Sequence, residues 1–208
     1  MAEGYLPSEL WERLAGAEEK LQANDDGHLP LGERRRVRAT FGDEGGGPED
    51  RTPGHRRRFA LNRDCVHRVM PVWRAARPDD DRPARMVELA EQLMNGQLSA
   101  DEVRAEEDRF AVDLMELAAD IGGWVNAAGE ASVDLISTAT VGDYGDDTPM
   151  EVDDHELDPD QLEAGFLGSI AVASYPGASD DDVEARRAYW RWYLEEAVPA
   201  AYRAVDDN

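Results

Sequence analysis

Cysteine and lysine are nearly absent from this 208-residue sequence, which contains one of each, Cys65 and Lys20. A single cysteine cannot form an internal disulfide, so the fold must be held by packing alone, as is usual in a reducing compartment. No run of about 18 apolar residues occurs, which argues against a membrane-spanning helix. The first residues, Met1 to Trp11, carry acids where an export signal needs a basic patch and an apolar stretch. We therefore expect a cytoplasmic protein without a membrane partner.

Basic residues are also scarce, and they are distributed unevenly along the sequence. The formal net charge is −24, yet residues 1–78 contain 14 basic against 13 acidic residues. Residues 79–208 contain 8 basic against 33 acidic ones, with no lysine or arginine between Arg109 and Arg186. The acids of that stretch must face water, cations, a basic partner or bases from elsewhere in the chain. Abundant arginine and aspartate are also typical of GC-rich genomes and salt-tolerant proteomes, so charge alone does not identify a partner.

Alternating apolar and polar residues, the pattern of a strand, are missing over any useful length. Apolar residues instead recur at helical spacing, between segments rich in glycine, proline and aspartate. The sequence therefore predicts an all-α protein, an irregular or orthogonal bundle of about 7–8 helices without significant sheet. The expected helices cover approximately residues 8–24, 31–41, 55–74, 83–95, 99–121, 124–140 and 159–175, with a last one after Ser179. Pro71 is expected to kink or thin the last turn of the third helix.

Length and composition favour one folded domain with a loosely attached N-terminal part. Two loops interrupt this domain. Residues 42–54 contain five glycines and two prolines and are expected to form a flexible loop. Residues 142–158 form an acidic loop, and loops on a rigid helical frame are where binding determinants usually sit.

No catalytic motif is present, and we predict no enzymatic activity, metal or cofactor. The four histidines show neither an HExxH motif nor paired spacing, and one cysteine cannot complete a zinc site. Cys65 and His67 are two positions apart on one helix and point to different sides, which disfavours a nucleophile pair. The triplets Arg34–Arg36 and Arg56–Arg58 could contact phosphates, but the net charge opposes nucleic-acid binding. We interpret these arginines as partners of the acidic C-terminal part.

The acidic loop is the main candidate for contact with a partner. Its carboxylates lack the spacing of a calcium-binding EF-hand loop, so a solvated or partner-facing surface is favoured over a specific cation site. A metal-dependent hydrolase that uses this Asp-rich loop remains an alternative. The candidate binding residues in the loop are Asp143, Asp146, Asp147, Asp153, Asp154 and Glu156.

The last helix contains the densest group of aromatic residues in the chain. Trp190, Leu194 and Ala197 share one face at i, i+4 and i+7 and are expected in the core. Trp192 falls off that face. It either packs against a neighbouring helix or is an exposed anchor for a partner, and we include it among the candidate binding residues.

This helix resembles the C-terminal signature of immunity protein family five of the bacterial polymorphic toxin systems. The segments Leu31–Gly42 and Val69–Trp73 are also similar, which gives an expected coverage of about 28–204. This coverage implies a single all-α domain, 28–208, preceded by an N-terminal helical extension, 1–27. The resemblance implies an all-α protein that binds and neutralises a cognate toxin, and it assigns no catalytic residue. The residues that carry the signature are Arg187, Tyr189, Trp190, Trp192, Tyr193, Leu194 and Pro199, with tyrosine at 189 and 193 where the signature has other aromatic residues.

An acidic inhibitor suits a toxin whose active site is basic, such as a nuclease. Complementary charges speed association, and carboxylates can occupy the positions of phosphates. We therefore expect the toxin to be neutralised through an acidic surface. Beside the hydrolase, an acidic scaffold adapted to salt or a nucleic-acid mimic is the remaining alternative.

Overall fold

The computed structural model describes residues 6–42, 51–141, 152–158 and 161–205, which are mostly helical and contain no strand. The helices are α1 (Ser8–Ala23), α2 (Leu31–Ala39), α3 (Pro53–Ala76), α4 (Arg82–Met94), α5 (Ala100–Ile121), α6 (Gly123–Val141), α7 (Ala164–Ala173), α8 (Val183–Trp192) and α9 (Val198–Arg203). A π-helical turn, Tyr193–Ala197, joins α8 to α9 in one continuous rod, which makes eight rods in the described part. The prediction of an all-α bundle of about 7–8 helices is confirmed.

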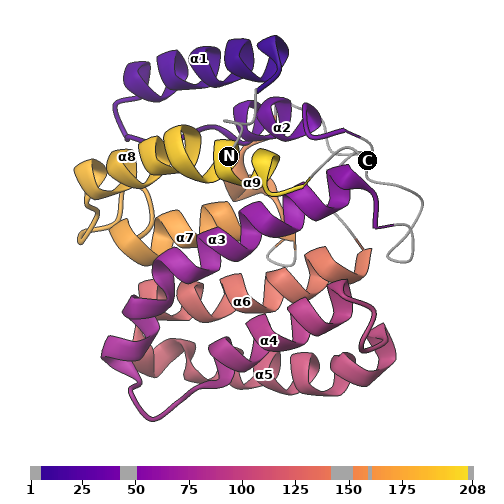
Figure 1. Cartoon of the computed structure of the whole chain (residues 1–208). Helices are drawn as coiled ribbons and strands as arrows, with labels where there is room; N and C mark the ends of the chain where they lie inside the picture. Colours follow the sequence, from indigo (N-terminus) through magenta and orange to yellow (C-terminus); the bar gives the residue numbers. More distant parts are fainter. Residues whose placement is uncertain (1–5, 43–50, 142–151, 159–160, 206–208) are drawn as a thin grey trace.

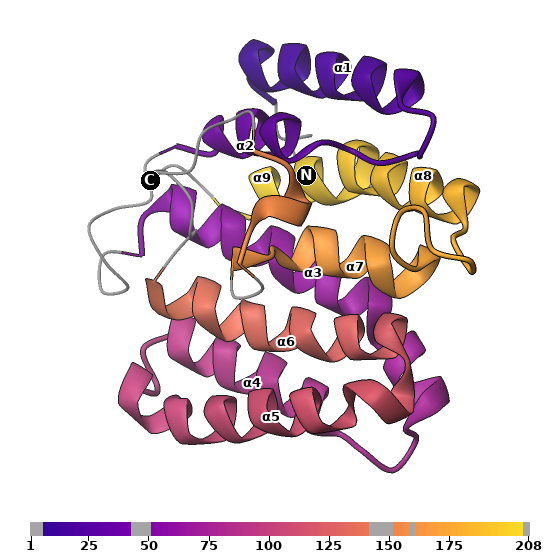
Figure 2. The same cartoon turned by 180° about the vertical axis from the view of Figure 1, so that it is seen from behind.

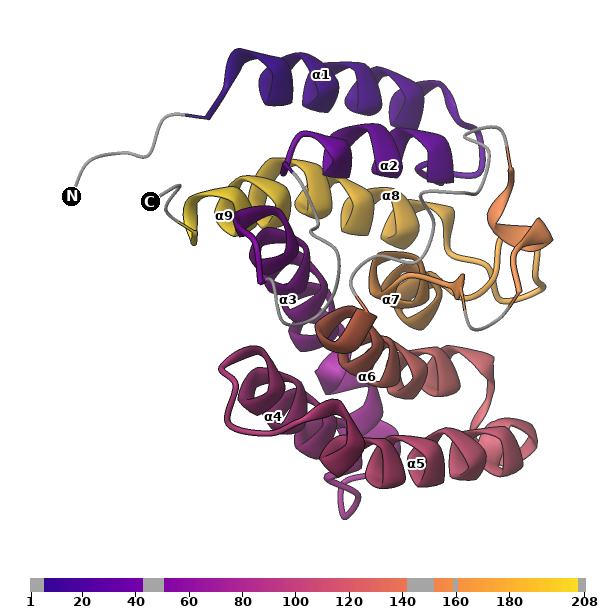
Figure 3. The ribbon, with the colours of Figure 1, turned by 90° about the vertical axis from the view of Figure 1, so that its right-hand side faces the viewer.

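The helices are stacked from α1 at one end of the molecule to α4 and α5 at the other (Figure 1). α3 runs obliquely through the middle, next to α7 (Figures 1 and 3). α6 lies at the centre of the lower half and packs against α3, α4, α5 and α7. α5 lies at the rim, and its main contacts are with α6 and α4.

α1 belongs to the same hydrophobic core as the rest of the chain. It buries Leu10, Leu14, Ala17 and Leu21, which lie on one side of the helix. These residues pack against α2, α8 and the π-helical turn. A domain boundary at residue 27 stays a prediction, but the core is continuous across that position.

α3 extends beyond both of its predicted ends. The side chain of Thr52 accepts the backbone N–H of His55, and Pro53 suits the first turn of a helix, where its missing N–H would have no partner in any case. At the other end the helix continues past Pro71 to Ala76. Trp73, in this last part, is fully buried and donates its indole N–H to the carbonyl oxygen of Asp80 at 2.9 Å. This packing outweighs the one backbone hydrogen bond that a proline removes.

α5 and α6 form an antiparallel pair (Figure 2). α5 begins with a reciprocal cap, in which the backbone N–H of Ser99 donates to the carboxylate of Glu102 at 2.8 Å. It ends at Gly122, whose φ of 80° lies in the region that favours glycine. Of the helices in the described part of the chain, none has the length and apolarity that a membrane crossing requires.

α7 begins at Ala164, later than the predicted start at Pro159. The residues ahead of it include a short 3₁₀ turn, Asp154–Glu156, and Glu163, whose carboxylate is held by arginines of α2. Small residues let the neighbouring helices approach closely. A Cβ atom on Gly168 would collide with the hydroxyl of Tyr189.

Candidate partner-binding surface

Arg34 is the centre of a buried ionic cluster between α2, the 3₁₀ turn and the start of α7. Its Nη1 donates to Asp154 Oδ2 at 3.1 Å, and its Nη2 donates to the other oxygen of the same carboxylate. Its Nε donates to Glu163 Oε2 at 3.0 Å, and Arg38 Nη1 lies 3.0 Å from that oxygen. His28 Nε2 lies 2.9 Å from Asp154 Oδ2. Two arginines and two carboxylates thus balance one another inside the protein.

The cluster keeps both acids ionised. Burial alone would raise the pKa of Asp154, but the Arg34 guanidinium and the His28 ring hold this pKa well below its usual value. Burial also opposes the ionisation of Glu163, whereas the charges of Arg38 and Arg34 lower its pKa. The pKa of His28 is lowered by burial and by the nearby arginine charge, which favours the neutral ring.

This arrangement confirms for Arg34 the prediction that N-terminal arginines pair with acids of the C-terminal part. It corrects the expectation for Asp154, which was assigned to a partner-facing surface. The side chain of Asp154 is only 2% exposed because its two oxygens face the arginine, so it is not available to a partner. The second triplet behaves differently, since Arg57 and Arg58 donate to backbone carbonyl groups, among them that of Phe41.

The structure describes only some of the other candidate residues of the acidic loop. Asp143, Asp146 and Asp147 lie outside the described residues. Asp153 and Glu156 are described and exposed, and Glu156 Oε2 accepts the backbone N–H of Asp153 at 3.1 Å. A role for these carboxylates in binding a partner stays a prediction.

The C-terminal aromatic motif consists mainly of packing residues. Its buried members are Tyr189, Trp190, Tyr193, Leu194 and Pro199. The Trp190 ring lies 5.8 Å from the His28 ring and 5.2 Å from the Arg34 guanidinium, measured to the ring centroid, so the motif packs directly on the ionic cluster.

The remaining two motif residues lie nearer the surface. Trp192 is half-buried, with the Arg68 guanidinium 5.1 Å from its ring centroid and the Tyr189 ring against it. These contacts favour the packing alternative for Trp192 over the exposed anchor. Arg187 donates to the backbone carbonyl of Asn24 at 3.0 Å and thereby ties α8 to the end of α1.

Burial makes the surface more acidic than the composition suggests. Among the described residues the buried arginines are Arg34, Arg38, Arg57, Arg58 and Arg186, whereas the buried acids are Asp154 and Glu163. Folding therefore withdraws five positive and two negative charges from the surface, a difference of three. An acidic exterior favours basic partners and speeds their approach.

A groove of about 520 Å³ runs between α5 and α6. Figure 2 shows α7, α6 and α5 one below the other on this side of the molecule. Its apolar lining includes Leu114, Met115, Val133, Leu162 and Leu167. Among the described residues, its acidic lining consists of Glu107, Asp108, Glu130 and Asp134, and Arg104 is its one basic lining residue. The groove thus combines apolar surface with several carboxylates.

Two acids of the groove accept hydrogen bonds from neutral side chains. The Ser137 hydroxyl donates to Glu107 Oε1 at 3.3 Å, and the Asn126 amide donates to Glu130 Oε1 at 2.6 Å. Burial raises the pKa of Glu107 and of Glu130. The hydrogen bonds from Ser137 and Asn126, and for Glu107 also the charge of Arg104, lower these pKa values by less. Keeping both carboxylates ionised in the groove therefore reduces the stability of the isolated protein.

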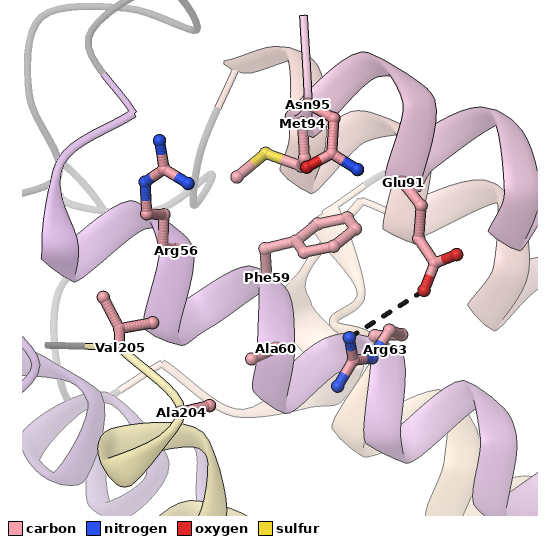
Figure 4. Close-up of a pocket in the computed structure, with 9 residues that line it drawn as sticks. All are labelled: Arg56, Phe59, Ala60, Arg63, Glu91, Met94, Asn95, Ala204 and Val205. Atoms are coloured by element: carbon pink, nitrogen blue, oxygen red, sulfur yellow. Dashed lines mark ion pairs between the residues drawn. The ribbon is translucent and has the colours of Figure 1, made fainter. Parts of the chain in front are cut away.

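A second hollow, of about 640 Å³, lies between α3, the end of α4 and the C-terminal residues (Figure 4). Arg63 Nη1 lies 3.8 Å from Glu91 Oε1, and Arg56 Nε donates to the carbonyl oxygen of Arg51 at 2.9 Å. Phe59 lies between these polar groups. Since the charges here have both signs and are already engaged, the hollow favours no class of ligand.

No group of three or more His, Cys, Asp or Glu side chains in the described part of the chain could hold a metal ion. Cys65 is fully buried, and burial raises the pKa of its thiol to about 12, which keeps it protonated. The described residues therefore offer neither a metal site nor an activated nucleophile at this cysteine.

A protein-family model described as "Immunity protein Imm5" matches residues 15–200. The chain belongs to this Imm5 immunity protein family. No curated protein matches the sequence. Membership in Imm5 confirms the family that the C-terminal aromatic motif indicated, and it suggests an immunity function.

The Imm5 match also corrects the extent of the resemblance. It begins at residue 15, inside α1, rather than at residue 28. The second half of α1 is thus part of the family match, in agreement with the packing of Leu21 in the common core. The match also contains the ionic cluster and both walls of the α5–α6 groove.

The groove was not predicted from the sequence. A signal was present, because Glu107, Asp108 and Ala111 on α5 and Glu130 and Asp134 on α6 recur at helical spacing. Recognising it requires knowing that these two faces meet, which depends on the register of the antiparallel pair. The acids of the acidic loop, in contrast, lie close together in the sequence and need no knowledge of the fold to be grouped.

Proposed function

We propose that this Imm5 protein binds a cognate toxin and neutralises it through an acidic surface. The match to the Imm5 family over residues 15–200 carries the proposal. The toxin is a protein with a basic face, and a nuclease with a basic active site fits best because such an enzyme is built to hold phosphates. The protein acts in the cytoplasm, without binding nucleic acid or membrane itself.

The distribution of charge supports an acidic contact surface. Exposed acids occur on α5, on the 3₁₀ turn and before α8, and the sequence has no basic residue between Arg109 and Arg186. Five arginines that could offset these acids are buried. Charged contacts at the rim of an interface increase the association rate, and this gain falls with ionic strength.

Co-expression with the product of the adjacent gene tests the proposal. We expect the two proteins to purify as one complex and the chain to restore growth of a bacterial host that produces the neighbouring protein. An unrelated protein of similar size and net charge is the control and should give neither result. No complex and no restored growth would contradict the proposal. Stability that rises steeply with salt in the absence of any partner would favour the salt-adapted scaffold.

A further inference from the structure

The α5–α6 groove has open apolar surface as well as charge. Met115 is 78% exposed, the largest exposed fraction among the large apolar side chains of the described residues. It lies beside the buried Leu114 at the α5 wall. Apolar surface of this kind at a rim helix has no partner within the described chain.

Three carboxylates of the groove have no ion-pair partner within 4.0 Å among the described residues: Glu107, Asp108 and Glu130. The fourth, Asp134, accepts the backbone N–H of Ala164 at 2.8 Å and helps to start α7. The α6 wall contributes acids but no base, since α6 contains neither lysine nor arginine. The described lining of the groove therefore has four acids against one base, Arg104, which leaves an excess of negative charge.

Guanidinium or ammonium groups are the natural complement of this site. A cation placed between two carboxylates of the groove would form charge-assisted hydrogen bonds and would offset the cost of keeping partly buried acids ionised. Apolar side chains next to that cation would cover Met115 and pack near the lining residues Leu114, Leu162 and Leu167. A volume of about 520 Å³ accommodates several side chains.

We propose that the α5–α6 groove binds a segment of the toxin in which arginine or lysine side chains alternate with apolar ones. This inference rests on the proposed function and specifies where and with what chemistry the toxin is held. A second copy of the chain is a poor occupant, because it carries the same net charge of −24 and the same acids. The acidic-loop residues remain a separate candidate surface.

Two charge reversals on the same helix test the groove. Asp108 lines it, whereas Asp120 is equally an exposed aspartate of α5 but lies outside it. Asp108→Arg and Asp120→Arg change the net charge by the same amount, so long-range attraction to a basic toxin is altered equally. The probe is the product of the adjacent gene, and its dissociation constant is measured by calorimetry for the parent chain and both variants. Thermal unfolding of each variant reports whether it is folded.

We expect Asp108→Arg to weaken binding by about 10-fold to 100-fold, and Asp120→Arg by less than about threefold. Equal weakening by both variants would show a general charge effect and overturn the groove assignment. If neither variant binds more weakly than the parent chain, the groove assignment is also overturned. The proposed function is then still supported, because the parent chain forms a complex with the toxin. If the parent chain forms no complex, the proposed function itself fails.

Oxidation of methionine provides a readout that needs no substitution. Met115 is exposed, whereas Met70, Met86 and Met94 are buried. Peroxide should oxidise Met115 quickly in the free chain and at least about fivefold more slowly in the complex, as followed by mass spectrometry. An unchanged rate for Met115 in a stoichiometric complex would contradict occupancy of the groove.

Discussion

Arg34 and Asp154 are 120 positions apart in sequence, yet the guanidinium of the first faces both carboxylate oxygens of the second inside the protein. Neither side chain is accessible, with exposed fractions of 0% and 2%. A buried charge without its partner is strongly unfavourable, so each residue depends on the other. The pair connects α2 to the chain that leads into α7.

Removing this carboxylate should destabilise the fold, whereas removing its neighbour should not. Asp154→Ala leaves part of the Arg34 charge uncompensated, and we expect the free energy of unfolding to fall by about 3–5 kcal/mol. Asp153→Ala, at an exposed position one residue earlier, should change it by less than about 0.5 kcal/mol. Urea unfolding followed by circular dichroism measures both. Equal effects of the two substitutions would contradict the structural role assigned to Asp154.

Stability should decrease as the pH is lowered from 7 to 3. The lowered pKa of His28 means that the unfolded ring takes up a proton first, below about pH 6.5, which favours unfolding. The lowered pKa values of Asp154 and Glu163 give a stabilising contribution that is present above about pH 4 and is lost as the pH falls further. The raised pKa values of Glu107 and Glu130 act in the opposite direction.

Urea unfolding at a series of pH values checks this dependence. Asp154→Asn is the informative variant, because it cannot ionise and should flatten the acidic part of the curve. A parent protein whose free energy of unfolding is constant between pH 7 and pH 3 would show that the buried cluster does not control its acid stability.

Close packing at Gly168 gives a prediction about two glycines. A Cβ atom there would collide with the Tyr189 hydroxyl, so Gly168→Ala should destabilise the protein by about 1–3 kcal/mol. Gly16, in α1, has nothing within 4 Å of the position of a Cβ atom, and Gly16→Ala should stabilise by about 0.5–1 kcal/mol. Thermal unfolding compares them. Adding Tyr189→Phe to Gly168→Ala should recover part of the loss, and no recovery would contradict this explanation.

Cys65 should be unreactive in the folded protein. Its thiol is buried and its pKa is raised to about 12, so almost no thiolate is present at neutral pH. A disulfide reagent at pH 8 should label less than about one tenth of the chains in buffer and nearly all of them in concentrated urea. Fast, complete labelling without denaturant would contradict the buried position of this side chain.

The helices were predictable because their signals are local. Ser99 and Glu102 mark the start of α5, and the apolar spacing of Trp190, Leu194 and Ala197 identifies the buried face of the last rod. The different environments of Asp153 and Asp154 were not predictable, since both are aspartates of one acidic run. Their difference depends on Arg34, which is distant in sequence and forms a buried ion pair with Asp154.

The groove could not be predicted either, because it also depends on contacts between residues that are distant in sequence. Each wall is an ordinary amphipathic helix, and only their antiparallel register places Glu107 opposite Ser137. Gly129 contributes to that register, because a Cβ atom there would lie 2.6 Å from Leu114 of α5. Contacts between helices, rather than the pattern within either one, create the candidate site.

Hydrogen–deuterium exchange of the chain, alone and with the product of the adjacent gene, tests most directly whether the toxin is held in the α5–α6 groove. Amide protons respond where a partner covers the surface or stabilises the local structure. We predict slower exchange in α5 and α6 on complex formation, with little change in α1. Slower exchange confined to other segments of a stoichiometric complex, with α5 and α6 unchanged, would contradict the account.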